Sequence, residues 1–237
     1  GACIRLIKKD EDFLNNNTLI IWGDSSKDYL DGSAGKDELN KYYLDIVYGN
    51  VKISEINNEK LMNLYNIGNL DAGNGFNVIS CQFSLHYFFE NKDKLDGVLN
   101  NISNSLKSGG IFIGTTLDGK KVFDLLKKNT SLGKHKNGQL LWKISKKYNS
   151  NKFSNNDSCL GYKVDVYMES IGKTNTEYLV NYNYLESILE NYNLRLKEYL
   201  DFSDVFDRLS SYNTKYGDAL GMIDELKTYS FLNKCFV

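Results

Sequence analysis

The alternation of strand-forming and helix-forming segments is the feature that most constrains the fold of this chain. Short runs rich in β-branched and aromatic residues at 18–22, 76–81 and 111–115 predict strands. Residues 92–106 repeat apolar side chains at a spacing of three and four, as an amphipathic helix does, and the Ser-Gly-Gly at 108–110 is expected to stop this helix. Strands that alternate with helices pack into a mostly parallel sheet covered on both faces, so the sequence predicts the α/β class.

The second half of the chain is richer in strands. Further strands are expected at 140–144, 160–168, 177–180, 194–200 and 231–237. Further helices are expected at 37–48, 120–128 and 184–192, with a short one at 60–65. The strand-rich part predicts an antiparallel edge or insertion beside the parallel sheet. Because no internal repeat and no Gly/Ser-rich linker interrupts the chain, residues 1–237 are predicted to form a single domain.

Composition narrows the classes of function. With 237 residues, 41% of them hydrophobic and 25% charged, the chain has the profile of a soluble globular protein. It shows neither a leader peptide nor an apolar stretch of ~18 residues, so neither a secreted nor a membrane protein is expected. The formal net charge is −1, whereas proteins that follow a nucleic-acid backbone carry a basic excess. Any nucleic acid is therefore expected to bind at one small feature.

Metal and disulfide chemistry are not expected. The four cysteines, Cys3, Cys81, Cys159 and Cys235, are scattered without a CxxC spacing. Only two histidines are present. Reduced thiols in a cytosol-like compartment follow from this pattern.

Two polar clusters directly follow predicted strands. The first is 23–27, and the second is 82–89, which holds a Gln, a His and four aromatic residues. Ligands of open α/β sheets bind at the carboxyl ends of the strands, so both clusters are candidate sites. Each also has a purely structural alternative. An Asp-Ser-Ser after a strand is commonly a helix N-cap, and a His among aromatic residues is commonly a core side chain.

Taken in order, these segments resemble a known family. The string FNVISCQFSLHYFFEN, the helix after it and the string LKSGGIFIGTTLDG resemble the mRNA cap guanine-N7 methyltransferases. GACIRLIKK, IWGDSSK and DGSAGKDE are similar to the giant-virus branch of that family, and GYKVDVYMESIGKTNTEYLV is similar to its strand-plus-Glu segment. The resemblance implies a Rossmann-like, S-adenosylmethionine-dependent methyltransferase sheet, incomplete at the N-terminus, with an antiparallel C-terminal portion.

The resemblance also implies a site for the methyl donor, S-adenosylmethionine, whose product is S-adenosylhomocysteine. Asp24 and Ser25 match the acidic-serine pair at the donor's adenine, and an Asp is suited to accept from the adenine amino group. Gln82 matches a residue at the donor's methionine end, and Tyr87 is expected to contribute to the same site.

A site for the cap guanine is implied in the same way. His86 and Tyr87 match residues that line the guanine, and Phe83 would offer a stacking face. Glu177 matches a Glu on the guanine edge, where one carboxylate can accept from both N1–H and N2–H. Because N7 carries no proton, no catalytic acid or base is expected, and His86 is interpreted as a positioning residue. Methylation makes the base cationic, which a carboxylate and aromatic faces favour.

Some segments depart from the family pattern. The glycine-rich loop for the donor's methionine part is absent, and 31–36, which resembles it superficially, is interpreted as a surface loop because it follows the Asp-Ser-Ser segment. The chain is therefore expected to begin just after the second strand of the domain, and its own affinity for the donor is expected to be reduced. Leu117 stands where many members have Pro, and Asn233 stands where several place a Tyr near the cap.

The predicted activity is transfer of a methyl group from S-adenosylmethionine to N7 of the guanosine cap during mRNA capping. The predicted partners are the capped mRNA 5′ end (GpppN) and other capping-enzyme domains or subunits, with no membrane and no metal. The compartment is expected to be nuclear for a cellular source and cytoplasmic for a giant virus. Two alternatives stay open: a catalytically inactive, methyltransferase-like stimulatory subunit of a capping enzyme, and a methyltransferase that acts on another substrate.

Overall fold

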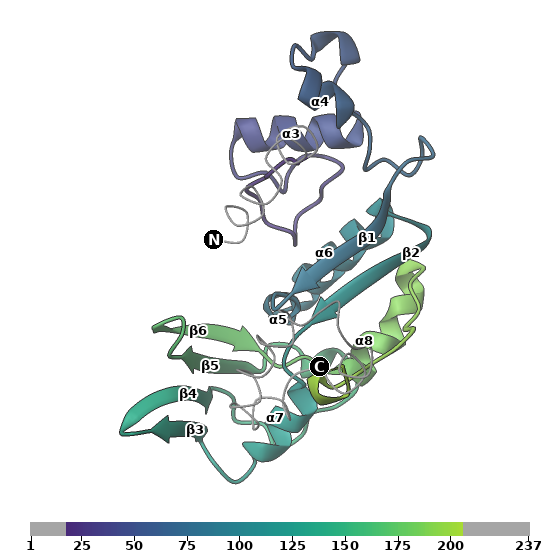
Figure 1. Ribbon diagram of the computed structural model, residues 1–237. Coiled ribbons are helices and arrows are strands. Elements are labelled where there is room, and N and C mark those ends of the chain that lie inside the picture. The colour runs from purple at the N-terminus through teal and green to yellow at the C-terminus, as the bar shows by residue number, and fades with distance from the viewer. Residues whose placement is uncertain (1–17, 206–237) are drawn as a thin grey trace, which may run out of the picture. The chain divides into compact units, whose positions relative to one another are not determined.

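The computed structural model describes residues 18–205, which fall into two compact units (Figure 1). Of the described residues, the first unit comprises 18–79 and 96–112, and the second comprises 80–95 and 113–205. The single domain predicted over 1–237 stays a prediction. The family-like opening segment, the strand predicted at 231–237 and Asn233 lie outside the described residues.

Local capping signals set helix α3 (Glu38–Tyr48) in the first unit. The Asp37 carboxylate accepts from the Asn40 backbone N–H at 2.9 Å, and Gly49 ends the helix in the left-handed conformation at φ 77°. The predicted helix at 37–48 is thus confirmed. Its buried face packs into an apolar cluster formed by Ala34, Leu44, Val47 and Tyr48 with Leu19, Ile21, Tyr29, Ile67 and Phe76. Two short helices follow, η1 (Ile53–Glu55) and α4 (Glu59–Asn63), the second at the predicted place.

Strands β1 (Phe76–Gln82) and β2 (Leu106–Thr115) pair as a two-stranded parallel sheet within the described residues (Figure 1). They confirm the predicted strands and the α/β class. The prediction that both faces of the parallel sheet are covered is wrong for β1 and β2. The side chains of Val78, Ile111 and Ile113 remain 54%, 45% and 47% exposed.

The glycine stop predicted after the amphipathic helix is also wrong. Helix α6 (Lys92–Ser105) ends three residues before Ser108, and β2 begins at the very next residue. Gly109 lies inside β2 with a φ of 78°, a conformation that L side chains rarely adopt. The glycines therefore serve the backbone of the strand and not the end of the helix.

Residues 18–22 do not form the predicted strand. The Trp22 backbone N–H donates to the Asn40 side chain at 2.6 Å, and the Trp22 carbonyl accepts from the Lys36 N–H at 3.0 Å. Gly23 makes a single antiparallel bridge with Gly35. These loop contacts satisfy the backbone groups that a neighbouring strand would otherwise have to satisfy.

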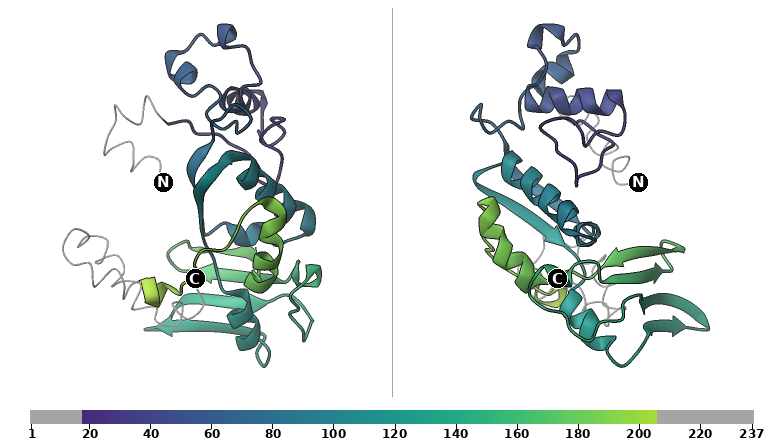
Figure 2. Two further views of the ribbon diagram at one scale, coloured as in Figure 1. Left: turned by 90° about the vertical axis from the view of Figure 1, so that its right-hand side faces the viewer. Right: turned by 180° about the vertical axis from the view of Figure 1, so that it is seen from behind.

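The second unit is built on an antiparallel sheet in the order β3-β4-β5-β6 (Figures 1 and 2). Its strands are β3 (Ser131–Lys136), β4 (Gln139–Lys146), β5 (Lys163–Met168) and β6 (Lys173–Tyr178). One face is buried through Trp142 and Ile144 of β4 and Val164 and Val166 of β5. The antiparallel portion is as predicted, but β3 was not expected, and the strand predicted at 177–180 lies instead at 173–178.

The second unit also contains several helices. They are α5 (Leu85–Phe88), α7 (Gly119–Leu125), α8 (Tyr182–Leu189) and the short η2 (Asp157–Cys159) and η3 (Glu190–Tyr192). The helices predicted at 120–128 and 184–192 are confirmed. The strand predicted at 194–200 is wrong, because this segment is held by a side chain: the Tyr199 hydroxyl donates to the Asp118 carboxylate at 2.8 Å.

Two further observations concern the described residues. No helix within 18–205 has the length and apolarity needed to cross a membrane. The thiols of Cys81 and Cys159 are free.

One side chain of α6 holds the loop at 23–29 in the first unit. Asn101 is buried and accepts from the Tyr29 N–H at 3.0 Å. It also donates to the carbonyl oxygens of Ser25 at 3.0 Å and Lys27 at 2.6 Å. All the polar groups of this amide are therefore used to fix one loop.

Replacing Asn101 by Ala is expected to lower the free energy of unfolding by about 2–3 kcal/mol, because three buried hydrogen bonds are lost together. Urea unfolding followed by circular dichroism measures the change. Asn100→Ala is the matched control, since Asn100 is exposed one position earlier on the same helix. Equal stability of the two variants would show that Asn101 does not hold the loop.

Candidate functional site

The end of β1 turns sharply at Phe83. This residue has a φ of 52°, in the left-handed region that a bulky side chain seldom adopts. Its backbone N–H donates to the carbonyl oxygen of Thr115 at 2.9 Å and to the Thr115 hydroxyl oxygen at 3.1 Å. Strained backbone of this kind concentrates at functional sites, where the surrounding structure holds it in place.

Gln82 is positioned by the same turn. Its side-chain oxygen accepts from the Thr115 hydroxyl at 2.8 Å, and its amide nitrogen donates to the Ser80 hydroxyl at 3.0 Å. The second N–H of the amide is left for another partner. Gln82 therefore has a fixed orientation at the carboxyl end of β1.

His86 lies on α5, directly after this turn, and is buried. Its Nδ1 lies 3.4 Å from the hydroxyl of buried Thr116, and its Nε2 has no hydrogen-bond partner. Burial lowers the pKa of His86 to about 4. The side chain is therefore a neutral imidazole at physiological pH, with one ring nitrogen ready for a ligand.

Glu177 reaches the same place from β6. Its Oε2 lies 3.7 Å from His86 Nε2, and its side chain is 14% exposed. Burial raises the pKa of Glu177 to about 7. The contact with neutral His86 is therefore no full ion pair at neutral pH, and a ligand with N–H donors would draw Glu177 into its carboxylate form.

Two aromatic side chains lie beside this pair. The Tyr87 ring centroid is 4.2 Å from that of His86, and Tyr87 is 44% exposed. The pKa of Tyr87 is raised by burial and by the charge of Glu177. Phe83 is 50% exposed, and its ring meets the ring of Phe202 edge-on at 6.0 Å. Open aromatic faces beside buried polar groups suit a planar base.

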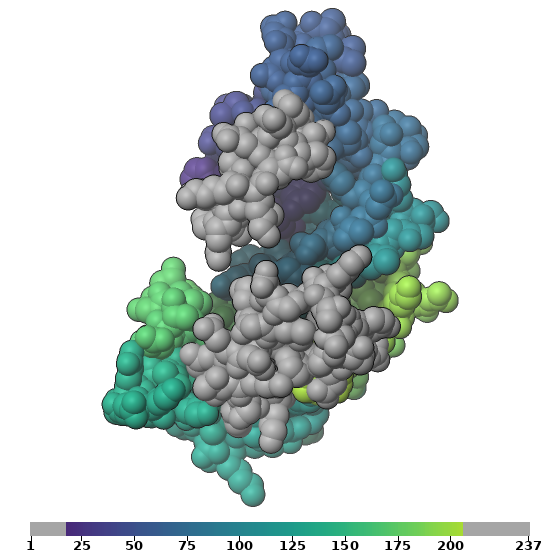
Figure 3. All heavy atoms as spheres, viewed as in Figure 1, coloured from purple at the N-terminus to yellow at the C-terminus, as the bar shows by residue number. Residues whose placement is uncertain are grey.

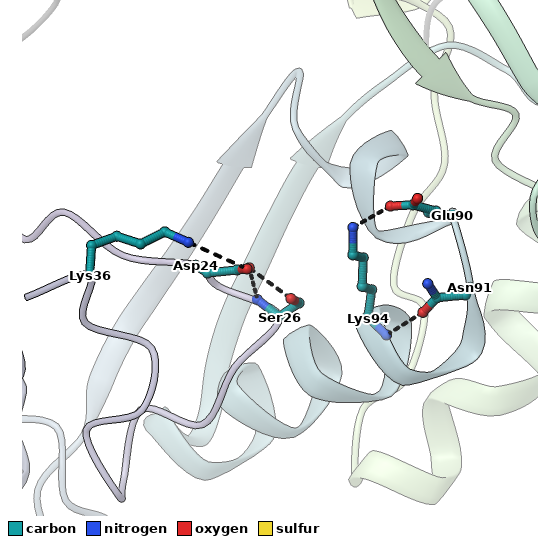
Figure 4. A network of polar contacts seen from close by, with 6 residues as sticks. All are labelled: Asp24, Ser26, Lys36, Glu90, Asn91 and Lys94. Atoms are coloured by element: carbon teal, nitrogen blue, oxygen red, sulfur yellow. Dashed lines mark hydrogen bonds and ion pairs between the residues drawn. The ribbon is translucent and has the colours of Figure 1, made fainter.

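The first predicted cluster, 23–27, lies in the first unit (Figure 4). One oxygen of the Asp24 carboxylate accepts from the Ser26 N–H at 3.0 Å and from the Ser26 hydroxyl at 2.7 Å. The other oxygen lies 3.9 Å from Lys36 Nζ. Gly97 of α6 allows the helix to approach this loop, because a Cβ there would lie 2.0 Å from the Ser26 carbonyl oxygen.

Ser25 borders a cavity in the first unit. Its hydroxyl accepts from the Tyr29 hydroxyl at 2.6 Å. The cavity has a volume of about 450 Å³, within the usual range of small-molecule pockets. Its lining is largely apolar: Thr18, Leu19, Ile21, Gly23, Ser25, Tyr29, Ala34, Leu44, Val47, Tyr48, Leu64, Ile67 and Phe76.

A separate polar group in the second unit caps α6. The Asn91 side chain accepts from the Lys94 N–H at 3.0 Å, and Lys94 pairs with Glu90 (Figure 4). The pKa of Glu90 is lowered by its hydrogen bond from Lys94. These contacts stabilise the start of the helix and add no group to the site around His86.

The structure brings His86, Tyr87 and Glu177 together, with Gln82 and Phe83 at the adjoining turn. Asp24 and Ser25 belong to the other unit. Sequence reasoning assigned no role to the threonine pair at the end of β2, although these two residues orient the site: Thr115 fixes Gln82 and the Phe83 turn, and Thr116 contacts His86. Their place at the end of the neighbouring strand was the available signal. Among residues 18–205, no cluster of three His, Cys, Asp or Glu side chains could hold a metal ion.

The polar and aromatic groups at the end of a strand place this chain among the α/β proteins that bind ligands at the carboxyl ends of their strands. Comparison with known proteins specifies its family. Residues 24–223 match the model of the mRNA (guanine-N(7))-methyltransferase domain. The chain belongs to this family, as its sequence motifs predicted.

Individual relatives agree with this assignment. The mRNA cap guanine-N(7) methyltransferase of Candida albicans is 32% identical over 55% of this chain and 28% of its own length. That of Saccharomyces cerevisiae is 31% identical over 54% of this chain and 30% of its own length. A probable mRNA-capping enzyme of Acanthamoeba polyphaga mimivirus is 30% identical over 70% of this chain and 14% of its own length. The chain thus spans less than a third of each of these relatives.

Among solved structures, an S-adenosylmethionine-dependent methyltransferase from Clostridium acetobutylicum ATCC 824 is 15% identical over 63% of this chain and 58% of that chain. The TM-score is 0.35, a likeness too slight to support an argument.

The burial of Glu177 predicts how stability depends on pH. Its pKa of about 7 in the folded chain lies above the ordinary value of 4.5, so the folded state holds the proton more tightly than the unfolded state. The stability that the protonated Glu177 carboxyl contributes is complete below pH 4.5 and is lost as the pH rises through 7. Glu177→Gln removes the ionisation, so we expect the free energy of unfolding of the variant to exceed that of the wild type by about 1–3 kcal/mol at pH 8 and by less at pH 5.

Urea unfolding at the two pH values measures this difference. Glu186→Gln serves as the control, because Glu186 is an exposed carboxylate of the same unit. A Glu177→Gln variant whose stability follows the wild type at both pH values would show that Glu177 ionises freely in the folded chain.

Proposed function

We propose that this chain takes part in the transfer of a methyl group from S-adenosylmethionine to N7 of the guanosine cap of mRNA. The observation that carries the proposal is the buried pair of Glu177 and His86. His86 presents an Nε2 that has no hydrogen-bond partner and lies 3.7 Å from Glu177 Oε2. A buried polar atom without a partner is costly, and a base edge with complementary groups would remove that cost.

The chemistry of Glu177 suits the edge of guanine. The N1–H and N2–H donors of the base lie side by side, and one carboxylate accepts both. Hydrogen bonds from these donors stabilise the charged carboxyl and therefore lower the pKa of Glu177 from about 7 on binding. A base without adjacent donors would leave the buried carboxyl unpaired, so the pair favours guanine over other bases.

The residues around the pair are proposed to position the base. Neutral His86 can bond to the guanine at Nε2, and the exposed faces of Tyr87 and Phe83 can contact the ring. Methylation at N7 leaves the base cationic, and a carboxylate with aromatic faces stabilises the positive charge that develops. N7 needs no deprotonation, so orientation supplies most of what this site contributes.

The donor is assigned to the first cluster and to Gln82. S-adenosylmethionine supplies an activated methyl group on a sulfonium. The Asp24 loop fits the adenine end of such a molecule. Ser26 contacts one carboxylate oxygen of Asp24, the other lies 3.9 Å from Lys36 Nζ, and Ser25 lies at the border of an apolar cavity large enough for a purine. Gln82, with one amide N–H still available, and Tyr87 are proposed to contact the methionine end.

The remaining expectations follow from the same proposal. The substrate is the capped 5′ end (GpppN), and other capping-enzyme domains or subunits are its further partners. The compartment is nuclear for a cellular source and cytoplasmic for a giant-virus source. The described residues form part of a single cap methyltransferase domain.

The guanine site is tested by His86→Ala and Glu177→Ala in the full-length protein. We expect each variant to lose methyl transfer to GpppG-capped RNA by about 100-fold or more while its affinity for S-adenosylhomocysteine stays unchanged. Radiolabelled methyl transfer and calorimetry give the two measurements, with the exposed Glu186→Ala as control. Full activity in both variants would mean that the guanine binds elsewhere and would favour another substrate.

The donor site is tested by Asp24→Asn. Asn keeps an acceptor for Ser26 and so preserves the loop, but it removes the charge from the proposed bond to the adenine amino group. We expect the affinity for S-adenosylhomocysteine to fall by about 10- to 100-fold in calorimetry. Asp31→Asn is the matched control in the neighbouring loop at 31–36, where the Asp31 carboxylate accepts from the Ser33 N–H at 2.8 Å. An equal loss of affinity in Asp24→Asn and Asp31→Asn would mean that the glycine-containing loop at 31–36 also contacts the donor.

A further inference from the structure

Charge is distributed unevenly along this chain. The formal net charge is −1, yet residues 125–156 contain eight lysines and no Asp or Glu. This run includes the hairpin of β3 and β4. A stretch of this length without any acid is a positively charged segment inside a nearly neutral protein. The carboxylates beside it come from the neighbouring strand and the turn after it: Asp165 pairs with Lys147, and Glu169 accepts from Gln139.

Three lysines of this run, Lys128, Lys136 and Lys143, are exposed and have no carboxylate partner among the described residues. Lys136 and Lys143 lie on the hairpin and Lys128 precedes β3; we call the three together the hairpin lysines. Two other lysines of the run do have such partners: Lys127 Nζ lies 2.7 Å from Asp124, and Lys147 Nζ lies 3.1 Å from Asp165. The hairpin surface, teal to green, lies open at the lower left of Figure 3.

The surface also has a hollow and an aromatic ring. A groove of about 280 Å³ on the hairpin is lined by Ser131, Leu132, Gly133, His135, Leu140 and Lys143. The partner of Lys143 in the register of β4 and β5 is Tyr167, which is half-buried. Lysines interleaved with an aromatic side chain on a sheet face are the combination that binds single-stranded nucleic acid: the charges meet phosphates and the ring meets bases.

We infer that the hairpin lysines and Tyr167 form a contact surface for the single-stranded RNA that follows the cap. This inference rests on the proposed function, because the cap fixes one end of that RNA at Glu177. Glu177 lies on β6, three strand spacings from β3 in the same sheet, or roughly 14 Å at ~4.8 Å per strand. In the strand register Glu177 lies opposite buried Val164, whereas Lys143 lies opposite Tyr167 on the other face of the sheet. RNA that leaves the guanine site therefore reaches the hairpin by passing around the edge of the sheet.

The charge variant replaces the three hairpin lysines by Gln in the full chain. A fluorescein-labelled, uncapped 20-nucleotide RNA is the probe, and its affinity is measured by anisotropy at several salt concentrations. We expect affinity at 0.1 M salt to fall by about tenfold or more, and the slope of log affinity against log salt to fall by roughly 2, since each phosphate contact with single-stranded RNA contributes ~0.7. Lys52, Lys60 and Lys197, all outside the run, are replaced together as the control and should leave the slope unchanged.

Tyr167→Leu tests the aromatic contact separately. Loss of one base stack is expected to weaken binding by roughly 5- to 100-fold and to leave the salt slope as it is. Wild-type affinity and slope in the charge variant would overturn the inference. So would binding of polyglutamate as tight as that of RNA and equally sensitive to the charge variant, because the surface would then serve an acidic protein.

The two proposals fail in different ways. Affinity for GpppG, which lacks the RNA body, should be unchanged in the charge variant and lost in Glu177→Ala. Retained GpppG binding together with an unaltered salt slope would overturn the hairpin surface alone. An altered slope in a protein that does not bind GpppG would overturn the guanine site alone.

Discussion

The desolvation of one acid and one imidazole is the constraint on which the candidate site depends. Burial lowers the pKa of His86 to about 4 and raises the pKa of Glu177 to about 7, so both groups favour their neutral forms. A neutral pair 3.7 Å apart recovers little of the cost of its burial. The fold must therefore hold the pair in place by other means, through the left-handed turn at Phe83 and the threonines at the end of β2. A complementary base edge that bonds to both groups would recover the free-energy cost of burying them.

The two units use the same kind of scaffold. In each, a polar loop or turn is fixed by side chains from a regular element: Asn101 of α6 holds the loop at 23–29, and Thr115 of β2 holds the turn at Phe83. Sites built this way keep their geometry without a ligand, which lowers the entropic cost of binding. A methyl transfer that relies on alignment rather than on proton transfer needs this kind of rigidity.

Local signals were predictable from the sequence, and contacts between distant residues were not. Asp37 and Gly49 mark the ends of α3 by their own chemistry, so its bounds could be predicted. Residues 18–22 have strand-forming side chains, but a strand needs a partner strand, and here Asn40 and Lys36 bond to the backbone groups of Trp22. The approach of Glu177 to His86 joins positions 91 residues apart. No spacing rule connects them, and only the resemblance to the cap methyltransferases placed them in one site.

Net charge averages over the whole chain and so hides local runs of charge. The total is −1, while the run at 125–156, which includes the hairpin of β3 and β4, holds eight lysines and no acid. The two surfaces would recognise RNA by different physics. A buried, neutral pair discriminates a base by hydrogen bonding and is insensitive to salt, whereas exposed lysines meet phosphates of any sequence and lose affinity as salt rises. Under the two proposals, recognition of the cap would be specific for guanine, while the RNA body would add affinity without adding sequence preference.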